Sequence, residues 1–213
     1  RVKEISIAVS GTHGKTTTSS MVGNILHEAK FDPTLIIGGI VNKFKSNNIS
    51  GSGNIIVVEA DEFDKSFLSL RPTYSIINNL DLEHLDCYED LESLQDTFLN
   101  FANFVPFYGK IIINNDCSNL DPIINNVNRQ KKTFGIINQS DIMAKEISYH
   151  KNKSKFTIIQ NESEKTNINL SCPGEHNIYN ALAAATMCAE LNISMKYIKR
   201  GLEKYLGVKR RFD

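Results

Sequence analysis

The stretch EISIAVSGTHGKTTT, residues 4–18, decides the fold expected for this chain. Residues 4–9 form a largely apolar run that predicts a buried strand, and the loop after it has glycines at positions 11 and 14. Beyond the loop, apolar residues recur at helical spacing: Met21, Val22, Ile25, Leu26 and Ala29. A strand, a glycine loop, Lys15-Thr16 and a helix, in that order, form the context in which a phosphate-binding loop is expected.

Such a loop binds phosphate through backbone N–H groups, which its glycines allow to turn inward, and through the positive end of the helix dipole. We predict that Lys15 reaches the outer phosphates and that the Thr16 hydroxyl holds Mg²⁺. The common loop is G-x-x-x-x-G-K-[ST], and here Val9 stands in place of its first glycine. A glycine-rich turn with a solvated lysine is the alternative.

Composition is that of an ordinary soluble domain. The chain has 213 residues, 41% of them apolar and 23% charged, which is enough for one good-sized core. The formal net charge is zero, so nothing indicates a nucleic acid or an acidic membrane as a partner. No apolar run reaches membrane-spanning length. The four cysteines lack C-x-x-C or metal-ligand spacing, which predicts free thiols in a reducing cytoplasm.

Apolar strand runs alternate with helical patterns, which predicts an α/β fold with a doubly wound, mostly parallel sheet. Three short segments between residues 141 and 171 predict a small antiparallel addition, while the polar residues 42–54 predict a loop. Asp90 is the expected N-cap of a helix, and the last helix is expected to start at Ser194 and end at Gly207. The expected strands are 34–37, 55–58, 74–77, 110–113, 133–134, 142–149, 155–160 and 166–170.

Acidic residues follow one buried strand, and ligands of open α/β sheets bind at such strand ends. Glu59 comes first and is predicted to bind a metal ion that also touches Thr16. For Asp61, Glu62 and Asp64, a solvated acidic turn is an equally good interpretation.

Histidine and asparagine side chains mark two further places. His84 follows the next strand, where a metal role competes with a structural one. His13 lies inside the loop and could hydrogen-bond a ligand. Asn177 and Asn180 share one helical face and could bind an adenine edge, although Asn177 could instead cap the helix.

Together these elements resemble the ATP-binding central domain of the Mur ligases, enzymes of peptidoglycan synthesis. Within the family, the chain most resembles the branch that adds L-alanine to UDP-N-acetylmuramate. Two features carry this resemblance: the Thr-His-Gly-Lys form of the loop and the short sequence separation between Glu59 and His84. The motifs that carry the resemblance occur in the family's order: GTHGKTTT at 11–18, EADE at 59–62, SFL at 66–68, EHLD at 83–86, FYG at 107–109, GEHNIYNALAA at 174–184 and GVKRRF at 207–212.

The resemblance implies roles for individual residues. Glu59 holds one Mg²⁺ with Thr16 and a second with His84, and Arg211 approaches the phosphates of ATP. His176, Asn177 and Asn180 contact the adenine side. Lys15, Glu59 and His84 are the expected catalytic residues. The phosphate-binding loop is expected to comprise Gly11, Thr12, His13, Gly14, Lys15, Thr16 and Thr17.

The resemblance also implies that residues 1–213 form a single central domain. A UDP-binding domain would precede it, a further domain would follow it, and the domain alone would lack ligase activity. Many Mur ligases carry a carbamylated lysine after the His84 motif, but no lysine lies between His84 and Gly109 here. Three alternatives stay open: a non-ligase P-loop NTPase or kinase, a recycled-peptide or folylpolyglutamate ligase, and a nucleotide-binding module without activity.

Overall fold

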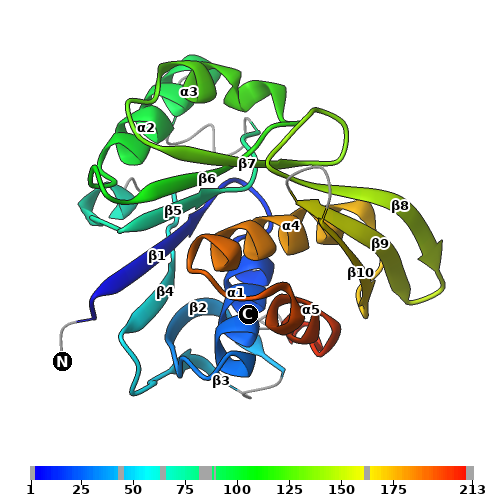
Figure 1. Ribbon diagram of the computed structural model, residues 1–213. Helices are drawn as coiled ribbons and strands as arrows, with labels where there is room; N and C mark the ends of the chain where they lie inside the picture. Colours follow the sequence, from blue (N-terminus) through cyan, green and yellow to red (C-terminus); the bar gives the residue numbers. More distant parts are fainter. Residues whose placement is uncertain are drawn as a thin grey trace.

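The computed structural model describes residues 3–42, 46–62, 66–81, 88, 90–160 and 164–209. Within them, helices cover both faces of an 11-stranded sheet (Figure 1). The strands are β1 (Ile5–Ser10), β2 (Thr34–Val41), β3 (Ser46–Ile49), β4 (Ile55–Glu59), β5 (Tyr74–Ile77), β6 (Lys110–Asn114), β7 (Lys131–Gly135), β8 (Ile142–His150), β9 (Lys153–Gln160), β10 (Glu164–Leu170) and β11 (Val208–Lys209). The helices are α1 (Lys15–Glu28), α2 (Leu91–Asn103), α3 (Asp121–Asn126), α4 (Glu175–Glu190) and α5 (Met195–Glu203), with short 3₁₀ turns η1 (Ser66–Ser69) and η2 (Ser118–Leu120).

The strand order is β10-β9-β8-β7-β6-β5-β1-β4-β2-β11, with β3 paired to β2. Neighbouring strands from β2 to β8 run parallel, whereas β8, β9 and β10 form an antiparallel ribbon. The predicted doubly wound, mostly parallel sheet with a small antiparallel addition is confirmed. Because β1 lies between β4 and β5, its loop meets the carboxyl ends of both neighbours, where ligands of such sheets bind.

The sheet separates two apolar cores, which explains why its central strands are apolar on both faces. Ile7 and Val9 of β1 belong to the core that α1, α4 and α5 cover. Ala8, between them, belongs to the core that α2 and α3 cover, whose largest side chains include Phe98 and Phe101. Figure 1 shows the two helix groups on opposite sides of β5, β6 and β7. The strand–loop–helix unit at the start of the chain is therefore anchored from both sides.

The predicted loop over residues 42–54 is wrong for part of its length. Residues 46–49 form β3, which pairs antiparallel with β2 through Leu35 opposite Ile49 and Ile36 opposite Asn48. The serine and asparagines of this segment predict a loop because they bury little apolar surface. Backbone pairing along β2 supplies the order that composition does not indicate.

The three predicted helix boundaries had different outcomes, and Ser194 is the N-cap of the last helix as expected. Asp90 does cap α2, since its Oδ1 accepts the N–H of Ser93 at 2.8 Å. The last helix ends at Glu203 rather than at Gly207. Gly207 has φ +83°, and the chain then pairs Val208 with Val41 of β2, so strand pairing ends the helix earlier than expected. Among the described residues, no helix is both long and apolar enough to cross a membrane.

Candidate functional site

The loop between β1 and α1 turns on two glycines with left-handed backbones. Gly11 has φ +122° and Gly14 has φ +81°. A Cβ atom added to Gly14 would stand 2.3 Å from Oδ1 of Asn180, so α4 approaches the loop too closely for a side chain. The first backbone N–H groups of α1 have no partner within the helix, as at every helix start. The arrangement therefore fits an anion site at the N-terminus of α1.

The segment after β5 fastens the loop. The N–H of His13 donates to Oδ1 of Asn79 at 2.8 Å, and Nδ2 of Asn79 donates to the carbonyl of His13 at 3.1 Å. The N–H of Asp81 donates to Oγ1 of Thr12 at 2.9 Å, and the N–H of Thr12 donates to the carbonyl of Asn79. Because Asn79 engages the N–H groups of Thr12 and His13, the N–H groups that an anion could meet here are those that follow them in the loop.

Lys15 is bound to a buried carboxylate. Its Nζ donates to Oε1 and Oε2 of Glu62 at 3.0 and 2.9 Å and to the carbonyl of Gly11 at 2.9 Å. Glu62 is only 2% exposed, so the interpretation as a solvated residue is wrong for it. Asp61 is exposed, as a solvated acidic turn predicts, and Asp64 lies outside the described residues.

Thr16 and Glu59 meet beside Lys15. Oγ1 of Thr16 donates to Oε2 of Glu59 at 3.2 Å, and the N–H of Gly38 donates to Oε1 at 2.9 Å. Burial raises the pKa of Glu59 above its usual value, although the hydrogen bonds from Gly38 and Thr16 and the charge of Lys15 oppose this shift. A carboxylate desolvated in this way gains from a cation placed against it.

The metal site predicted from Thr16, Glu59 and His84 is described only in part, because His84 lies outside the described residues. Arg211, expected near the phosphates of ATP, also lies outside them. Within the described ranges, no three His, Cys, Asp or Glu side chains gather as a ready-made metal site. Thr16 and Glu59 still offer a hydroxyl and a carboxylate side by side. Mg²⁺ prefers such oxygen ligands and is usually held by one or two carboxylates plus substrate phosphates, so this pair fits it.

The start of α4 contributes amides to the same region. Asn180 is 5% exposed, and its Oδ1 accepts the hydroxyl of Thr18 at 3.2 Å. Asn177 does not cap the helix, because its Nδ2 donates to the carbonyl of Pro173 at 2.7 Å while Gly174 occupies the N-cap position. His176 is exposed beside it.

A cavity of about 570 Å³ joins the loop to α4. Six of the predicted site residues line it, three from the loop and three from α4. Lys15, Thr16 and Glu59 are not among its lining residues and gather instead at the first turn of α1. The full lining is His13, Gly14, Thr17, Asn78, Asn79, Asn114, Asp116, Cys117, Phe134, His176, Asn177, Tyr179 and Asn180.

Asp116 and Tyr179 line this cavity, and the sequence did not single them out. The carboxylate of Asp116 accepts the N–H groups of residues 136, 137 and 138 and the hydroxyl of Tyr179, the last at 3.0 Å. Burial opposes ionisation, but the N–H donors and the tyrosine outweigh it and lower the pKa of Asp116. An ionised Asp116 thus ties the segment after β7 to α4. Asn78 and Asn114 were also missed, although each directly follows or ends a buried strand.

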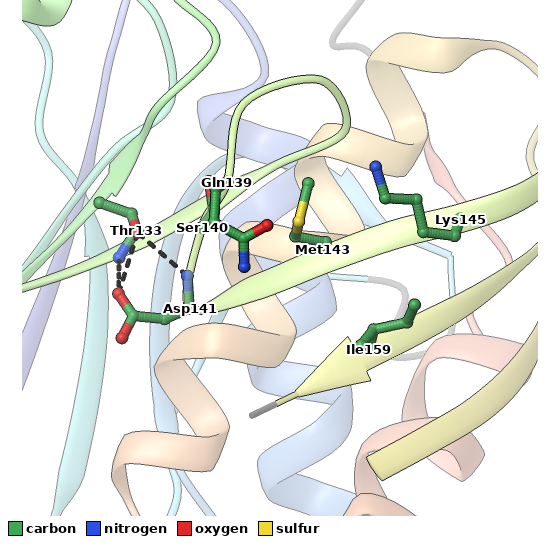
Figure 2. A pocket seen from close by; sticks show the side chains of 7 residues that line it. All are labelled: Thr133, Gln139, Ser140, Asp141, Met143, Lys145 and Ile159. Atoms are coloured by element: carbon green, nitrogen blue, oxygen red, sulfur yellow. Dashed lines mark hydrogen bonds between the residues drawn. The ribbon is translucent and has the colours of Figure 1, made fainter. Parts of the chain in front are cut away.

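A second cavity, of about 580 Å³, lies over β7, β8 and β9 (Figure 2). None of the predicted site residues lines it. Its carboxylate, Asp141, is already engaged by the N–H and hydroxyl of Thr133, as the dashed lines show, and by Lys132. The candidate site is therefore the region around the glycine loop.

Replacing Gly14 by alanine is expected to destabilise the protein more than replacing Gly207 by alanine. Both positions have nearly the same positive φ, a left-handed backbone that costs a side chain about 1–2 kcal/mol. Among the described residues, the nearest atom to a Cβ added at Gly207 is 3.6 Å away, whereas at Gly14 it is 2.3 Å away, and overpacking adds about 1–3 kcal/mol. Urea unfolding of both variants measures the difference. Equal midpoints would contradict the close approach of α4.

The chain is similar along most of its length to known proteins. A family model described as the Mur ligase middle domain matches residues 9–188. The UDP-N-acetylmuramate–L-alanine ligase of Chlorobium phaeobacteroides strain DSM 266 is 45% identical, over 97% of this chain and 44% of that protein. The ligase of the same name from Salinibacter ruber is 40% identical, over 99% of this chain and 44% of that protein. The chain thus spans less than half the length of these curated relatives.

Solved structures show the same likeness. The UDP-N-acetylmuramate-alanine ligase of Thermotoga maritima superimposes with a TM-score of 0.84 at 28% identity, over 99% of this chain and 47% of that one. A murein peptide ligase from Psychrobacter arcticus gives a TM-score of 0.82 at 32% identity, over 97% of this chain and 48% of that one.

Proposed function

This chain belongs to the Mur ligase family, whose middle domain it matches, and from that premise we propose that it is the ATP-binding part of a ligase that joins L-alanine to UDP-N-acetylmuramate. One observation carries the proposal: Lys15, Thr16 and Glu59 meet at one glycine loop, at the carboxyl ends of parallel strands. The names of the relatives that are 45% and 40% identical support alanine as the amino acid added.

ATP is the nucleotide that the family uses, and the proposed binding mode follows from the two halves of the site. The phosphates lie at the first turn of α1, where Lys15 and free N–H groups neutralise them. The adenine lies in the cavity beside α4, whose volume of about 570 Å³ is within the usual range for ligand pockets. Asparagine amides there offer a donor and an acceptor, which suits the edge of adenine.

The proposed reaction is amide formation through an acyl phosphate. The lactoyl carboxylate of UDP-N-acetylmuramate attacks the γ-phosphorus of ATP, and ADP leaves. The amine of L-alanine then attacks the carbonyl carbon, loses a proton and expels phosphate. Lys15 and the N–H groups of α1 stabilise the charge that develops on the transferring phosphoryl group.

Thr16 and Glu59 are proposed to hold Mg²⁺ in this reaction, and His84 to hold a second ion with Glu59. When bound, the metal would supply positive charge that offsets the negative charge of the phosphates during phosphoryl transfer. His176 and Arg211 are proposed to contact ATP. Domains on either side of this one are proposed to hold the uridine nucleotide and alanine. The setting proposed is the cytoplasm, since Cys117, Cys172 and Cys188 are free thiols, as is usual in a reducing compartment.

A murein peptide ligase is a second candidate, because the Psychrobacter arcticus enzyme is 32% identical to this chain. Such an enzyme would run the same chemistry with a peptide in place of alanine. One neighbour at 25% identity is named for the peptide L-alanyl-γ-D-glutamyl-meso-diaminopimelate, which supplies the competing substrate for a test.

The test is phosphate release by the full-length protein that carries this chain. With ATP and Mg²⁺ present, we expect release to require both UDP-N-acetylmuramate and L-alanine, and mass spectrometry to find the alanyl product. Release with the tripeptide but not with alanine would favour the second candidate. Release that is independent of any acceptor would indicate an NTPase.

A further inference from the structure

The ammonium group of Lys15 has no donor left for a phosphate. A lysine carries three N–H donors, and here the carbonyl of Gly11 and the two carboxylate oxygens of Glu62 accept from Nζ at 2.9–3.0 Å. A phosphate oxygen can reach Lys15 only by replacing one of these acceptors. Because the Gly11 carbonyl is part of the loop backbone, the exchangeable acceptor is a carboxylate oxygen of Glu62.

Glu62 is built into the protein rather than laid on its surface. Its side chain is 2% exposed, and the hydroxyl of the buried Tyr88 donates to its backbone carbonyl at 2.7 Å. A buried carboxylate needs its counter-charge, since removing one partner of a buried pair leaves an uncompensated charge. When a phosphate binds, Lys15 therefore has to keep a hydrogen bond to Glu62 while it donates another to the phosphate.

We propose that Glu62 is a positioning residue. Both of its carboxylate oxygens accept hydrogen bonds from Lys15 until the phosphates of a nucleotide displace one of them. This inference rests on the proposed function, because it takes the nucleotide to bind at this loop. In the empty site the pair is neutral, so the charge of Lys15 is masked. In the occupied site Glu62 keeps one bond to the ammonium and holds it over the phosphates.

A change of Glu62 to glutamine measures this competition. The amide keeps the shape of the side chain but removes its charge, so the phosphates meet an unmasked ammonium. Calorimetry on the full-length Glu62→Gln protein should show ATP binding about tenfold tighter, ADP tightened less, and adenosine unchanged. If Glu62 had a purely structural role, the change in affinity would not depend on the number of phosphates in the ligand.

Asp61→Asn is the matched control. Asp61 carries the same charge next to Glu62, but its side chain is 65% exposed and its Oδ1 lies 3.9 Å from Nζ of Lys15. Solvent weakens such a contact, so the ATP affinity of Asp61→Asn should stay within about twofold of the wild type.

Urea unfolding tests the pair without nucleotide. Lys15→Ala should lower the midpoint, and Lys15→Ala combined with Glu62→Gln should recover part of the loss, because no buried charge is left unpaired. Unchanged or weaker ATP binding by Glu62→Gln would overturn the proposal. Failure of the wild type to bind ATP would instead overturn the proposed function, so the two failures are distinct.

Discussion

Replacing Lys15 by alanine is expected to abolish calorimetrically detectable ATP binding and to lower ligase turnover by about 10³-fold, as when a main transition-state contact is lost. Lys15 places a cation at the glycine loop, and the backbone N–H groups of Thr12 and His13 are engaged by Asn79. The N–H groups at the start of α1 carry only partial positive charge and do not replace a full cation. The measurement is calorimetry with ATP, together with phosphate release by the full-length protein.

The ion pair between Lys15 and Glu62 determines which control variants the Lys15→Ala experiment needs. Lys15→Ala leaves Glu62 buried without its cation, so lost binding could be confused with lost folding. The double variant Lys15→Ala, Glu62→Gln removes that problem and should bind ATP as poorly as the single one. Lys132→Ala, which removes an equal charge beside the second cavity, should bind normally. Unchanged affinity in both Lys15 variants would refute the phosphate-binding loop.

The second large effect is expected from Glu59→Gln. The amide retains an oxygen for the N–H of Gly38 but loses the charge that faces Thr16. We expect turnover to fall by about 10²-fold and the Mg²⁺ concentration for half-maximal rate to rise, because the metal loses its charged ligand. A Mg²⁺ titration of phosphate release measures both quantities.

ATP affinity in the absence of Mg²⁺ should be nearly unchanged in this variant, which separates a metal role from a role in nucleotide binding. Asp61→Asn again controls for the loss of one negative charge nearby. A normal Mg²⁺ requirement in Glu59→Gln would show that Glu59 only braces Gly38 and Thr16.

The central part of the fold could be predicted because its signals are local. The apolar runs at 55–58 and 111–113 and the glycine loop before Lys15 each predict an element from adjacent residues alone. Strand β3 could not be predicted in this way, because Ser46 and Asn48 resemble loop residues and are ordered by β2. The early end of α5 has the same cause, since pairing of Val208 with β2 lies outside any local pattern.

The residues of the candidate site likewise fall into those with a local sequence signal and those without one. Thr16 and Glu59 could be paired in advance because each directly follows a recognisable element. Glu62 could not be told from Asp61, since both are carboxylates of one acidic run. Its burial depends on Lys15, 47 residues away, and on Tyr88. Asp116 gave no signal, because the N–H groups that hold it belong to a loop beyond β7.

The close fit of Gly14 and Thr18 against Asn180 also sets an order in time. The hydroxyl of Thr18 and the amide of Asn180 that it contacts are 162 residues apart in the chain. At the usual speed of translation, roughly 8 to 32 s separate their synthesis. During that interval the newly made loop lacks the surface of α4 against which it packs in the folded protein. The candidate site is therefore completed only late, after most of this chain has left the ribosome.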